Sequence, residues 1–316
     1  MGLLRGLFLI AGLLIVGGLI VTVMALRDTH QRVVALEAVH AFAKTRHGQI
    51  EYQRWGIGEP VLVIHGAGGG FDQGRLLVEA MGLEGYNWIS VSRFGYLGSA
   101  MPENPSTAAQ AEAFMDLLDE LGIERVSILA MSGGVPPALK FAELFPNNID
   151  HMVLLSPAPF TPFSPDIEDR PIPTWVYSAL LENDFIYWCL TKLARSRLEE
   201  AFDARRDLRT GLSTSEQVFI HKLIDTFLPA SRRAKGVGNE VVAVDPNATY
   251  NLEAIRAPVL VIHARDDRLN LFEVSEDIAS RVENSQLLPL DTGGHLLLGH
   301  HEELSTKIDG FLNNGG

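Results

Sequence analysis

Short, mainly apolar runs recur along the chain. They cover residues 60–65, 126–130, 152–155, 258–263 and 287–290. A strand that is buried on both faces needs such a run, whereas a half-exposed strand alternates polar and apolar positions. Parallel sheets are normally covered on both faces. The runs therefore predict buried strands of a mostly parallel central sheet.

The longest apolar stretch lies near the N-terminus. From Leu7 to Leu26, twenty residues contain one polar side chain, that of Thr22. At about 1.5 Å of rise per residue, such a helix matches a bilayer core of about 30 Å. A cleaved secretory signal normally has only about 7–15 apolar residues, and residues 23–25 make a poor cleavage site. We predict a retained transmembrane anchor in residues 1–30, with residues 7–26 in the lipid bilayer.

The charges beside this stretch nearly balance. Arg5 precedes it, whereas Arg27, Asp28 and Arg32 follow it. The positive-inside rule therefore does not decide the orientation. We expect a single-pass membrane protein, with a slight preference for the rest of the chain, residues 31–316, outside the cytoplasm.

A long segment separates the run that ends near Ser156 from the run that contains Val259. It opens with a proline-rich stretch and then has the character of helices. We predict a helical insert over residues 157–250, between two parts of one core, residues 31–156 and 251–316. The insert is rich in aromatic side chains, which are Phe160, Phe163, Trp175, Tyr177, Phe185, Tyr187, Trp188, Phe202, Phe219 and Phe227.

Composition narrows the partners. The net charge of −13 argues against nucleic acid and against adhesion to acidic lipid, because both require basic surfaces. The arginine clusters at 205–206 and 232–233 are expected to be solvated helix faces rather than receptors for a carboxylate. The single cysteine, Cys189, permits no intramolecular disulfide, and its aromatic neighbours favour a packed thiol over a reactive one.

One serine stands where a strand is predicted to turn into a helix. Ser132 follows the run at 126–130 and precedes a helical stretch that contains Pro136, and the residues two positions away, Ala130 and Gly134, are small. Such a turn strains its central residue and leaves no room for large flanking side chains. A serine hydroxyl attacks only when a neutral imidazole, oriented by a carboxylate, removes its proton. We predict that Ser132 is a nucleophile, the alternative being an ordinary turn serine.

The order of these features resembles the α/β-hydrolase superfamily, whose members carry a serine, an acid and a histidine in that sequence. The likeness extends from about His47 to Phe311. It includes the glycine loop at 66–70, the segment 92–99 and the helical stretch 138–146. The resemblance implies an α/β-hydrolase fold, a mostly parallel central sheet flanked by helices, with a helical cap insertion.

The resemblance also implies roles for single residues. Ser132 would be the nucleophile, His295 the acid and base, and Asp267 the residue that orients the histidine. Asp266 and Asp166 remain competing carboxylates. His295 is preferred over the other histidines because it follows two glycines and the acid.

By the same resemblance, the backbone N–H groups of Ala67 and Gly133 would form the oxyanion hole, which binds the charge on the attacked carbonyl oxygen. The insert would be a cap that shapes the pocket. Candidate substrate contacts are Met131, Phe160, Trp175 and Trp188. His65 and His263, at the ends of buried runs, are expected to be supporting or packing residues.

Other chemistries find little support. Residues 300–303, His-His-Glu-Glu, are not spaced as metal ligands, and the chain has no His-Glu-x-x-His pattern. The loop at 66–70 lacks the fingerprints of phosphate and dinucleotide loops. We therefore expect no metal and no cofactor. Dehalogenase and epoxide-hydrolase relatives are disfavoured because they have aspartate where this chain has Ser132.

The leading hypothesis is a membrane-anchored serine hydrolase. It would cleave a carboxylic ester of an apolar substrate through an acyl-enzyme on Ser132. An amidase or aminopeptidase with the same three residues is the first alternative. A catalytically silent protein that uses the same fold for binding at the membrane is the second.

Overall fold

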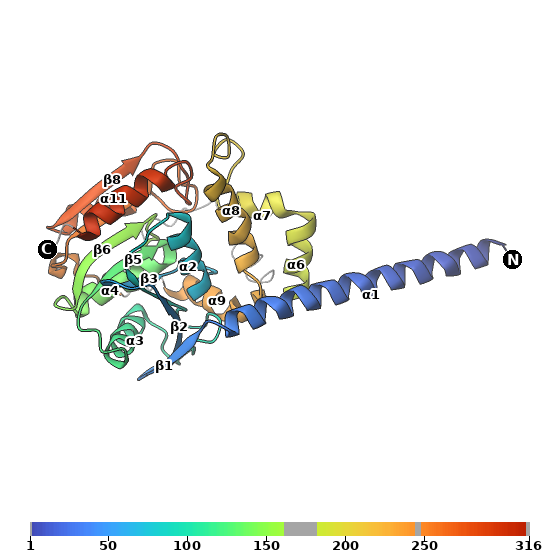
Figure 1. Cartoon of the computed structure of the whole chain (residues 1–316), viewed down its shortest axis with the longest axis horizontal. Coiled ribbons are helices and arrows are strands. Elements are labelled where there is room, and N and C mark those ends of the chain that lie inside the picture. The colour runs from blue at the N-terminus through green and yellow to red at the C-terminus, as the bar shows by residue number, and fades with distance from the viewer. Residues whose placement is uncertain (1, 161–181, 244–247, 314–316) are drawn as a thin grey trace.

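The computed structural model describes residues 2–160, 182–243 and 248–313, and its centre is an eight-stranded sheet (Figure 1). The strand order is β1-β2-β4-β3-β5-β6-β7-β8. The strands are β1 (Ala41–Thr45), β2 (Gly48–Trp55), β3 (Pro60–Ile64), β4 (Asn87–Val91), β5 (Val126–Met131), β6 (Ile149–Leu155), β7 (Val259–Ala264) and β8 (Ser285–Leu290).

Most of the sheet is parallel. Strands β4, β3, β5, β6, β7 and β8 pair in parallel, whereas β1 and β2 form an antiparallel edge next to β4. Each of the five apolar runs matches, to within one residue at its ends, part or all of one of the strands β3, β5, β6, β7 and β8. The prediction of a mostly parallel sheet is confirmed.

Helices cover both faces of the sheet. Successive side chains of a strand point to opposite faces, and β3 follows this rule: Val61 and Val63 join one apolar cluster, Leu62 and Ile64 the other. The core helices are α2 (Phe71–Ala80), α3 (Thr107–Glu120), α4 (Val135–Leu144), α10 (Glu273–Arg281) and α11 (His301–Asn313). Helices α2 and α11 contribute side chains to the first cluster, and α3, α4 and α10 contribute to the second.

The described part of residues 157–250, called the insert below, is mainly helical. It contains α6 (Asp184–Leu193), α7 (Arg195–Ala201), α8 (Thr214–Thr226), the short 3₁₀ helix η2 (Ala230–Arg232) and α9 (Ala234–Ala243). The expectation of solvated arginine faces is wrong for two residues: Arg205 is 8% exposed and Arg233 is fully buried. Both take part in ion pairs with buried acids, which a helical pattern of charges does not reveal.

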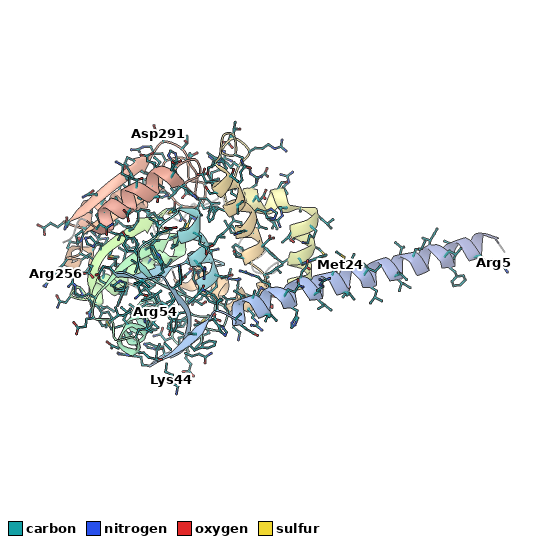
Figure 2. The ribbon with its side chains drawn as sticks, in the orientation of Figure 1. Arg5, Met24, Lys44, Arg54, Arg256 and Asp291 are labelled. Carbon is teal, nitrogen blue, oxygen red and sulfur yellow. The ribbon has the colours of Figure 1, made fainter. Side chains whose placement is uncertain are left out.

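The N-terminal helix α1 (Gly2–Glu37) continues past residue 30 without interruption. It projects away from the rest of the chain, and Figure 2 shows Arg5 at its far end and Met24 closer to the body. An 18-residue window of this helix has a mean hydropathy of 2.8 and none of it is buried. By length and composition, α1 is a candidate membrane span.

The C-terminal part of α1 is attached to the body by polar contacts. Asp28 accepts a hydrogen bond from the indole N–H of Trp188, at 2.9 Å, and lies 3.7 Å from the Lys192 ammonium group of α6. Arg32 forms an ion pair with Asp72 of α2, and Glu37 pairs with Arg232 of the insert. Helix α1 is therefore fixed to both the insert and the core.

Candidate active site

Ser132 occupies a strained turn between β5 and α4. Its φ angle of 52° lies in the left-handed region, which costs a residue with a side chain about 1–3 kcal/mol. Two residues later, a Cβ atom on Gly134 would lie 2.4 Å from the backbone oxygen of Ile64. The need for a small residue at this flank is therefore a matter of backbone contact with the neighbouring strand β3.

Asp267 and His295 come together from the loops after β7 and β8. The imidazole Nδ1–H of His295 donates to Oδ2 of Asp267 at 2.9 Å, and the carboxylate is fully buried. Its other oxygen accepts the backbone N–H groups of Leu269, at 2.7 Å, and Asn270, at 3.0 Å. These bonds fix the carboxylate and leave Nε2 of His295 as the nitrogen that can accept a proton.

A second histidine supports the same carboxylate. His263, at the end of β7, donates its Nε2–H to Oδ2 of Asp267 at 2.9 Å, and its Nδ1 accepts from the Ser275 hydroxyl at 2.7 Å. Its side chain is fully buried. His263 thus lies behind the predicted acid and helps to orient it.

The electrostatics of the pair favour its charged form. Burial alone would lower the pKa of His295, but the charge of Asp267 and the hydrogen bond to it outweigh burial and raise this pKa above its ordinary value. Burial would raise the pKa of Asp267, yet the two histidines together hold it well below its ordinary value. The aspartate therefore stays ionised and stabilises a protonated His295.

Ser132 and His295 are linked through other polar groups. Asn270 Nδ2 donates to the Ser132 hydroxyl at 3.4 Å and to the backbone oxygen of Ser156 at 2.9 Å. The Ser156 hydroxyl in turn donates to the backbone oxygen of His295 at 2.9 Å. Among the described residues, Ser132 has no hydrogen bond to His295. Such bonds are often long or misaligned before substrate binds.

The two predicted oxyanion donors lie side by side. A Cβ atom built on Gly133 would be 3.3 Å from the backbone nitrogen of Ala67, and one built on Gly66 would be 3.1 Å from Cβ of Ser132. The start of the glycine loop at 66–70 therefore lies against the serine. A side chain at Gly66 would crowd Ser132, and one at Gly133 would crowd the backbone nitrogen of Ala67.

His65 holds the start of this loop. Its Nδ1–H donates to the backbone oxygen of Gly66 at 2.6 Å, and its Nε2 accepts the backbone N–H of Arg93 at 3.0 Å. Burial and the Arg93 charge lower the pKa of His65 well below its ordinary value. The ring is therefore neutral, as it must be to donate through one nitrogen and accept through the other.

The competing carboxylates have different environments. Asp266 binds the Arg205 guanidinium at 2.6 Å and accepts the backbone N–H of Gly294 at 2.8 Å. It faces the insert rather than the imidazole of His295. Asp166 lies outside the residues that the structure describes.

Of the four residues predicted to contact substrate, those that the structure describes lie in different surroundings. Met131 is half-buried beside Ser132. Phe160 is 1% exposed and packs edge-on against Tyr250. Trp188 packs at the junction with α1, where its N–H binds Asp28. Trp175 lies outside the described residues. Of the described candidates, Met131 adjoins the serine in the chain, whereas Phe160 and Trp188 are engaged with Tyr250 and Asp28.

The insert contributes a carboxylate that the pattern of the sequence did not single out. Asp203 accepts the backbone N–H groups of His295, at 2.9 Å, and Arg268, at 3.2 Å. It also pairs with Arg205 at 2.6 Å, and its side chain is 1% exposed. Asp203 therefore fixes the backbone that carries His295. Its positive φ of 62° is the only local sign of a special role.

Metal binding finds no support in the described part of the chain, where no group of three or more His, Cys, Asp or Glu side chains could hold an ion. The chemistry available at the site is that of a strained hydroxyl, an imidazole with an ionised carboxylate behind it, and two adjacent backbone N–H groups.

Comparison with known proteins places this geometry in context. A family model described as "alpha/beta hydrolase fold" matches residues 59–302. The chain is 26% identical over 293 residues to the 2-hydroxy-6-oxononadienedioate/2-hydroxy-6-oxononatrienedioate hydrolase 2 of Pseudomonas putida, a match that covers 84% of this chain and 93% of that protein.

Two solved structures show the same fold. An alpha/beta hydrolase fold protein from Nakamurella multipartita superposes with a TM-score of 0.74 at 24% identity, covering 88% of this chain and all of the other. The esterase EaEST from Exiguobacterium antarcticum has a TM-score of 0.65 at 20% identity, covering 86% of this chain and 98% of the esterase. At these identities the likeness carries the fold alone.

Proposed function

The chain belongs to the α/β-hydrolase family, and from this premise we propose that it is a serine hydrolase that forms an acyl-enzyme on Ser132. The observation that carries the proposal is the buried Asp267–His295 pair in a site that also contains a strained serine and two adjacent N–H groups. Serine, histidine and a carboxylate in these roles are the minimum that acyl transfer needs.

Each group has one task in the reaction. Nε2 of His295 accepts the hydroxyl proton while Oγ of Ser132 attacks the substrate carbonyl carbon. The carbonyl oxygen takes up the negative charge and receives hydrogen bonds from the N–H groups of Ala67 and Gly133. His295 then gives the proton to the leaving alcohol, which departs as the acyl-enzyme forms. Water repeats the sequence, and the acid product leaves with Ser132 restored.

The magnitudes favour this assignment over a passive role. An oxyanion donor is typically worth about a hundred- to a thousand-fold in rate. In serine hydrolases of other folds, loss of the nucleophile removes about a million-fold. The strain at Ser132 and the cost of burying the Asp267 charge oppose folding, so such features persist mainly where function requires them.

A carboxylic ester of an apolar substrate is the substrate class that we propose. The aromatic composition of the insert favours an apolar acyl or alcohol group. An aminopeptidase would need a carboxylate that is free to bind an amine. Glu240, which approaches Gly133, is instead paired with Arg93. The same pair leaves Arg93 without a free charge for a dianionic substrate of the kind named in the P. putida relative.

Fluorophosphonate labelling of the full chain in detergent tests the proposal. We expect one adduct, on Ser132, together with turnover of p-nitrophenyl esters, and Ser132→Ala should abolish both. Matched anilides and 2-hydroxy-6-oxononadienedioate, tested beside the esters, should react far more slowly. A wild-type protein that is folded but is not labelled and has no turnover would refute the enzyme and favour a silent binding fold.

We also propose that α1 is a retained anchor, with residues 7–26 in the bilayer and the catalytic body outside the cytoplasm. The exposed apolar surface of the helix supports the proposal, because such a surface is costly in water. The full chain should stay in membranes after alkaline extraction, whereas a chain without residues 1–26 should be released. Protease added outside intact cells should degrade the body, and a body that is protected there would reverse the orientation.

A further inference from the structure

Two charged side chains at helix α9 of the insert bear on the glycine loop at 66–70. Arg233, the residue just before the helix, contacts the loop directly at Gly69. Glu240, within the helix, acts at one remove, through Arg93 and Tyr96. Neither Arg233 nor Glu240 belongs to the predicted catalytic residues.

Glu240 binds two residues that in turn hold the backbone of the loop. Its Oε1 forms an ion pair with the Arg93 guanidinium and accepts the Tyr96 hydroxyl at 2.6 Å. Arg93 Nε donates to the backbone oxygen of His65 at 3.0 Å, and Tyr96 Oη accepts the backbone N–H of Gly68 at 3.1 Å. The residues on either side of Gly66 and Ala67 are thus held by partners of Glu240.

The carboxylate determines what the tyrosine can do. A phenol has one proton, and here that proton is donated to Glu240, which leaves the oxygen lone pairs to accept the N–H of Gly68. Burial, first, and the nearby Glu240 charge raise the pKa of Tyr96 well above its ordinary value, so the hydroxyl keeps its proton. Without Glu240, the orientation of this hydroxyl would no longer be specified.

Arg233 holds the other end of the loop. Its Nη1 donates to the backbone oxygen of Gly69 at 2.5 Å, and its Nη2 lies 2.9 Å from Asp72 in the first turn of α2. The side chain is fully buried. The loop is therefore held from the insert at both ends.

Helix α9 is too closely packed on its neighbours to be a loosely attached lid at this point. The backbone N–H of Gly236 donates to the backbone oxygen of Gly95 at 3.0 Å, and a Cβ atom on Gly236 would lie 2.4 Å from the Tyr96 ring. A Cβ atom on Gly133 would be 2.9 Å from Glu240 Oε2 and 3.3 Å from the nitrogen of Ala67. The carboxylate thus approaches Gly133, one of the two residues predicted to supply oxyanion donors.

We propose that Glu240 is a positioning residue, which acts through Arg93 and Tyr96 to hold the N–H of Ala67 in the geometry that stabilises the oxyanion. This inference rests on the proposed function of the site. It assigns to the insert a part in transition-state stabilisation, in addition to shaping a pocket. A catalytic constellation has to be held within about 0.5 Å of its productive geometry, and this network is the means available to the loop.

Kinetics of Glu240→Ala provide the test, measured on the full chain in detergent. An oxyanion donor acts in the transition state and not on the bound ester. We expect kcat for p-nitrophenyl esters to fall about tenfold, as part of the hundred- to thousand-fold value of one donor, while KM stays within about twofold. Equal changes in kcat and KM that leave kcat/KM unaltered would overturn the proposal.

Glu199→Ala is the matched control. Glu199, in α7, is a mostly buried acid of the insert that pairs with an arginine, Arg209, at 2.7 Å. Among the described residues it has no hydrogen bond or ion pair to the glycine loop. It should leave kcat at the wild-type value. If Glu199→Ala lowers kcat as much as Glu240→Ala does, the effect belongs to general weakening of the insert and the proposal fails.

Hydrogen exchange separates this proposal from that of the catalytic function. In Glu240→Ala, peptides that contain residues 66–70 should exchange faster than in wild type and in Glu199→Ala, because the Gly68 N–H loses a fixed acceptor. This readout requires no turnover, so it remains valid if the wild-type protein proves inactive on esters. Unchanged exchange in this loop would refute the positioning role whatever the activity.

Tyr96→Phe provides a second variant in case Glu240→Ala does not fold. It removes the acceptor of the Gly68 N–H and leaves the ion pair between Arg93 and Glu240 in place. The same fall in kcat and the same faster exchange at residues 66–70 are expected. Wild-type values of both would contradict the proposed path from Glu240 to the loop.

Discussion

The core and the insert hold the same site by different means. In the core, the site residues stand at the ends of buried strands, and they are supported by backbone groups and by the side chains of Asn270 and His263. In the insert, the contacts to the site are made by charged side chains: Asp203 and Arg233, which are buried, and Glu240, which is partly buried.

This difference separates the residues proposed to react from the residues that hold them in place. The groups that would react all belong to the core, whereas the insert fixes the backbone of the histidine loop and of the glycine loop. Buried ion pairs are costly to form but also costly to break, because loss of one partner strands a charge. An insert attached in this way restricts the motion of the two loops that it contacts. Four experiments, ordered by expected effect, test the comparison.

Asp267→Asn should have the largest effect. The variant keeps the shape of the side chain but removes the charge that stabilises protonated His295, and the equivalent change in a serine protease lowers kcat about ten-thousand-fold. We expect a similar loss of ester turnover, with the fold preserved in circular dichroism. A loss of less than tenfold would mean that another carboxylate orients His295, and Asp266→Asn would then be the variant to measure.

Asp203→Ala should mainly affect stability. It removes the acceptor of two backbone N–H groups and one partner of the buried Arg205. The free energy of unfolding, measured by urea denaturation, should fall by about 3 kcal/mol. Asp207→Ala is the control, because Asp207 lies 3.5 Å from the same arginine but is 67% exposed. It should cost no more than about 1 kcal/mol.

The loss of kcat/KM at low pH, the acid limb of the rate profile, should depend on carboxylates of both the core and the insert. His295 must be neutral to accept the serine proton, and its raised pKa means that activity is lost, as the pH falls, at a higher pH than for an ordinary histidine. Asp267→Asn should move the limb of kcat/KM to lower pH. Asp203→Asn should move it in the same direction by less, because Asp203 contributes the smaller part of the field. A larger shift from Asp203→Asn than from Asp267→Asn would mean that Asp203 has the greater influence on the pKa of His295.

Glu253→Gln should have the smallest effect. Glu253 pairs with Arg281 on the surface, where water and salt screen the charges, and neither residue contacts the site. The midpoint of thermal unfolding and kcat should both match the wild type. A clear fall in either would show that surface pairs matter as much as the buried pairs of the insert.

The sequence predicts the core well because its signals are local. The apolar runs mark the strands, and the small residues around Ser132 mark the turn where β5 meets α4. The family membership and the fold are confirmed. The roles of Ser132, Asp267 and His295 stay predictions, although the structure places the last two in hydrogen-bond contact.

The supporting residues could not be found in the same way, because their partners are distant in the sequence. Glu240 meets Arg93 across 147 positions, and Asp203 meets His295 across 92. Each of these is an ordinary polar residue in its own segment. Arg233 is an example of the resulting error. Its charged neighbours in the sequence indicate a solvated helix face, but its ion-pair partner, Asp72, lies on another element and makes burial of the arginine possible.

The unbroken course of α1 has a consequence for how the protein would meet its substrate. At about 1.5 Å per residue the 36-residue helix is about 54 Å long. The part after Leu26 lies against the body, which Asp28 already contacts, so the insert would sit at the surface of the apolar layer. Because Asp28 and Arg32 fix this part to the body, no flexible tether intervenes. In a bilayer the enzyme would therefore diffuse laterally with its body at a fixed distance from the membrane and in a fixed orientation. It would meet substrates by diffusion in two dimensions rather than three. For a substrate confined to the same membrane, the rate of encounter would depend on the number of enzyme molecules per membrane area. Doubling the cell volume at constant membrane area would leave this rate unchanged.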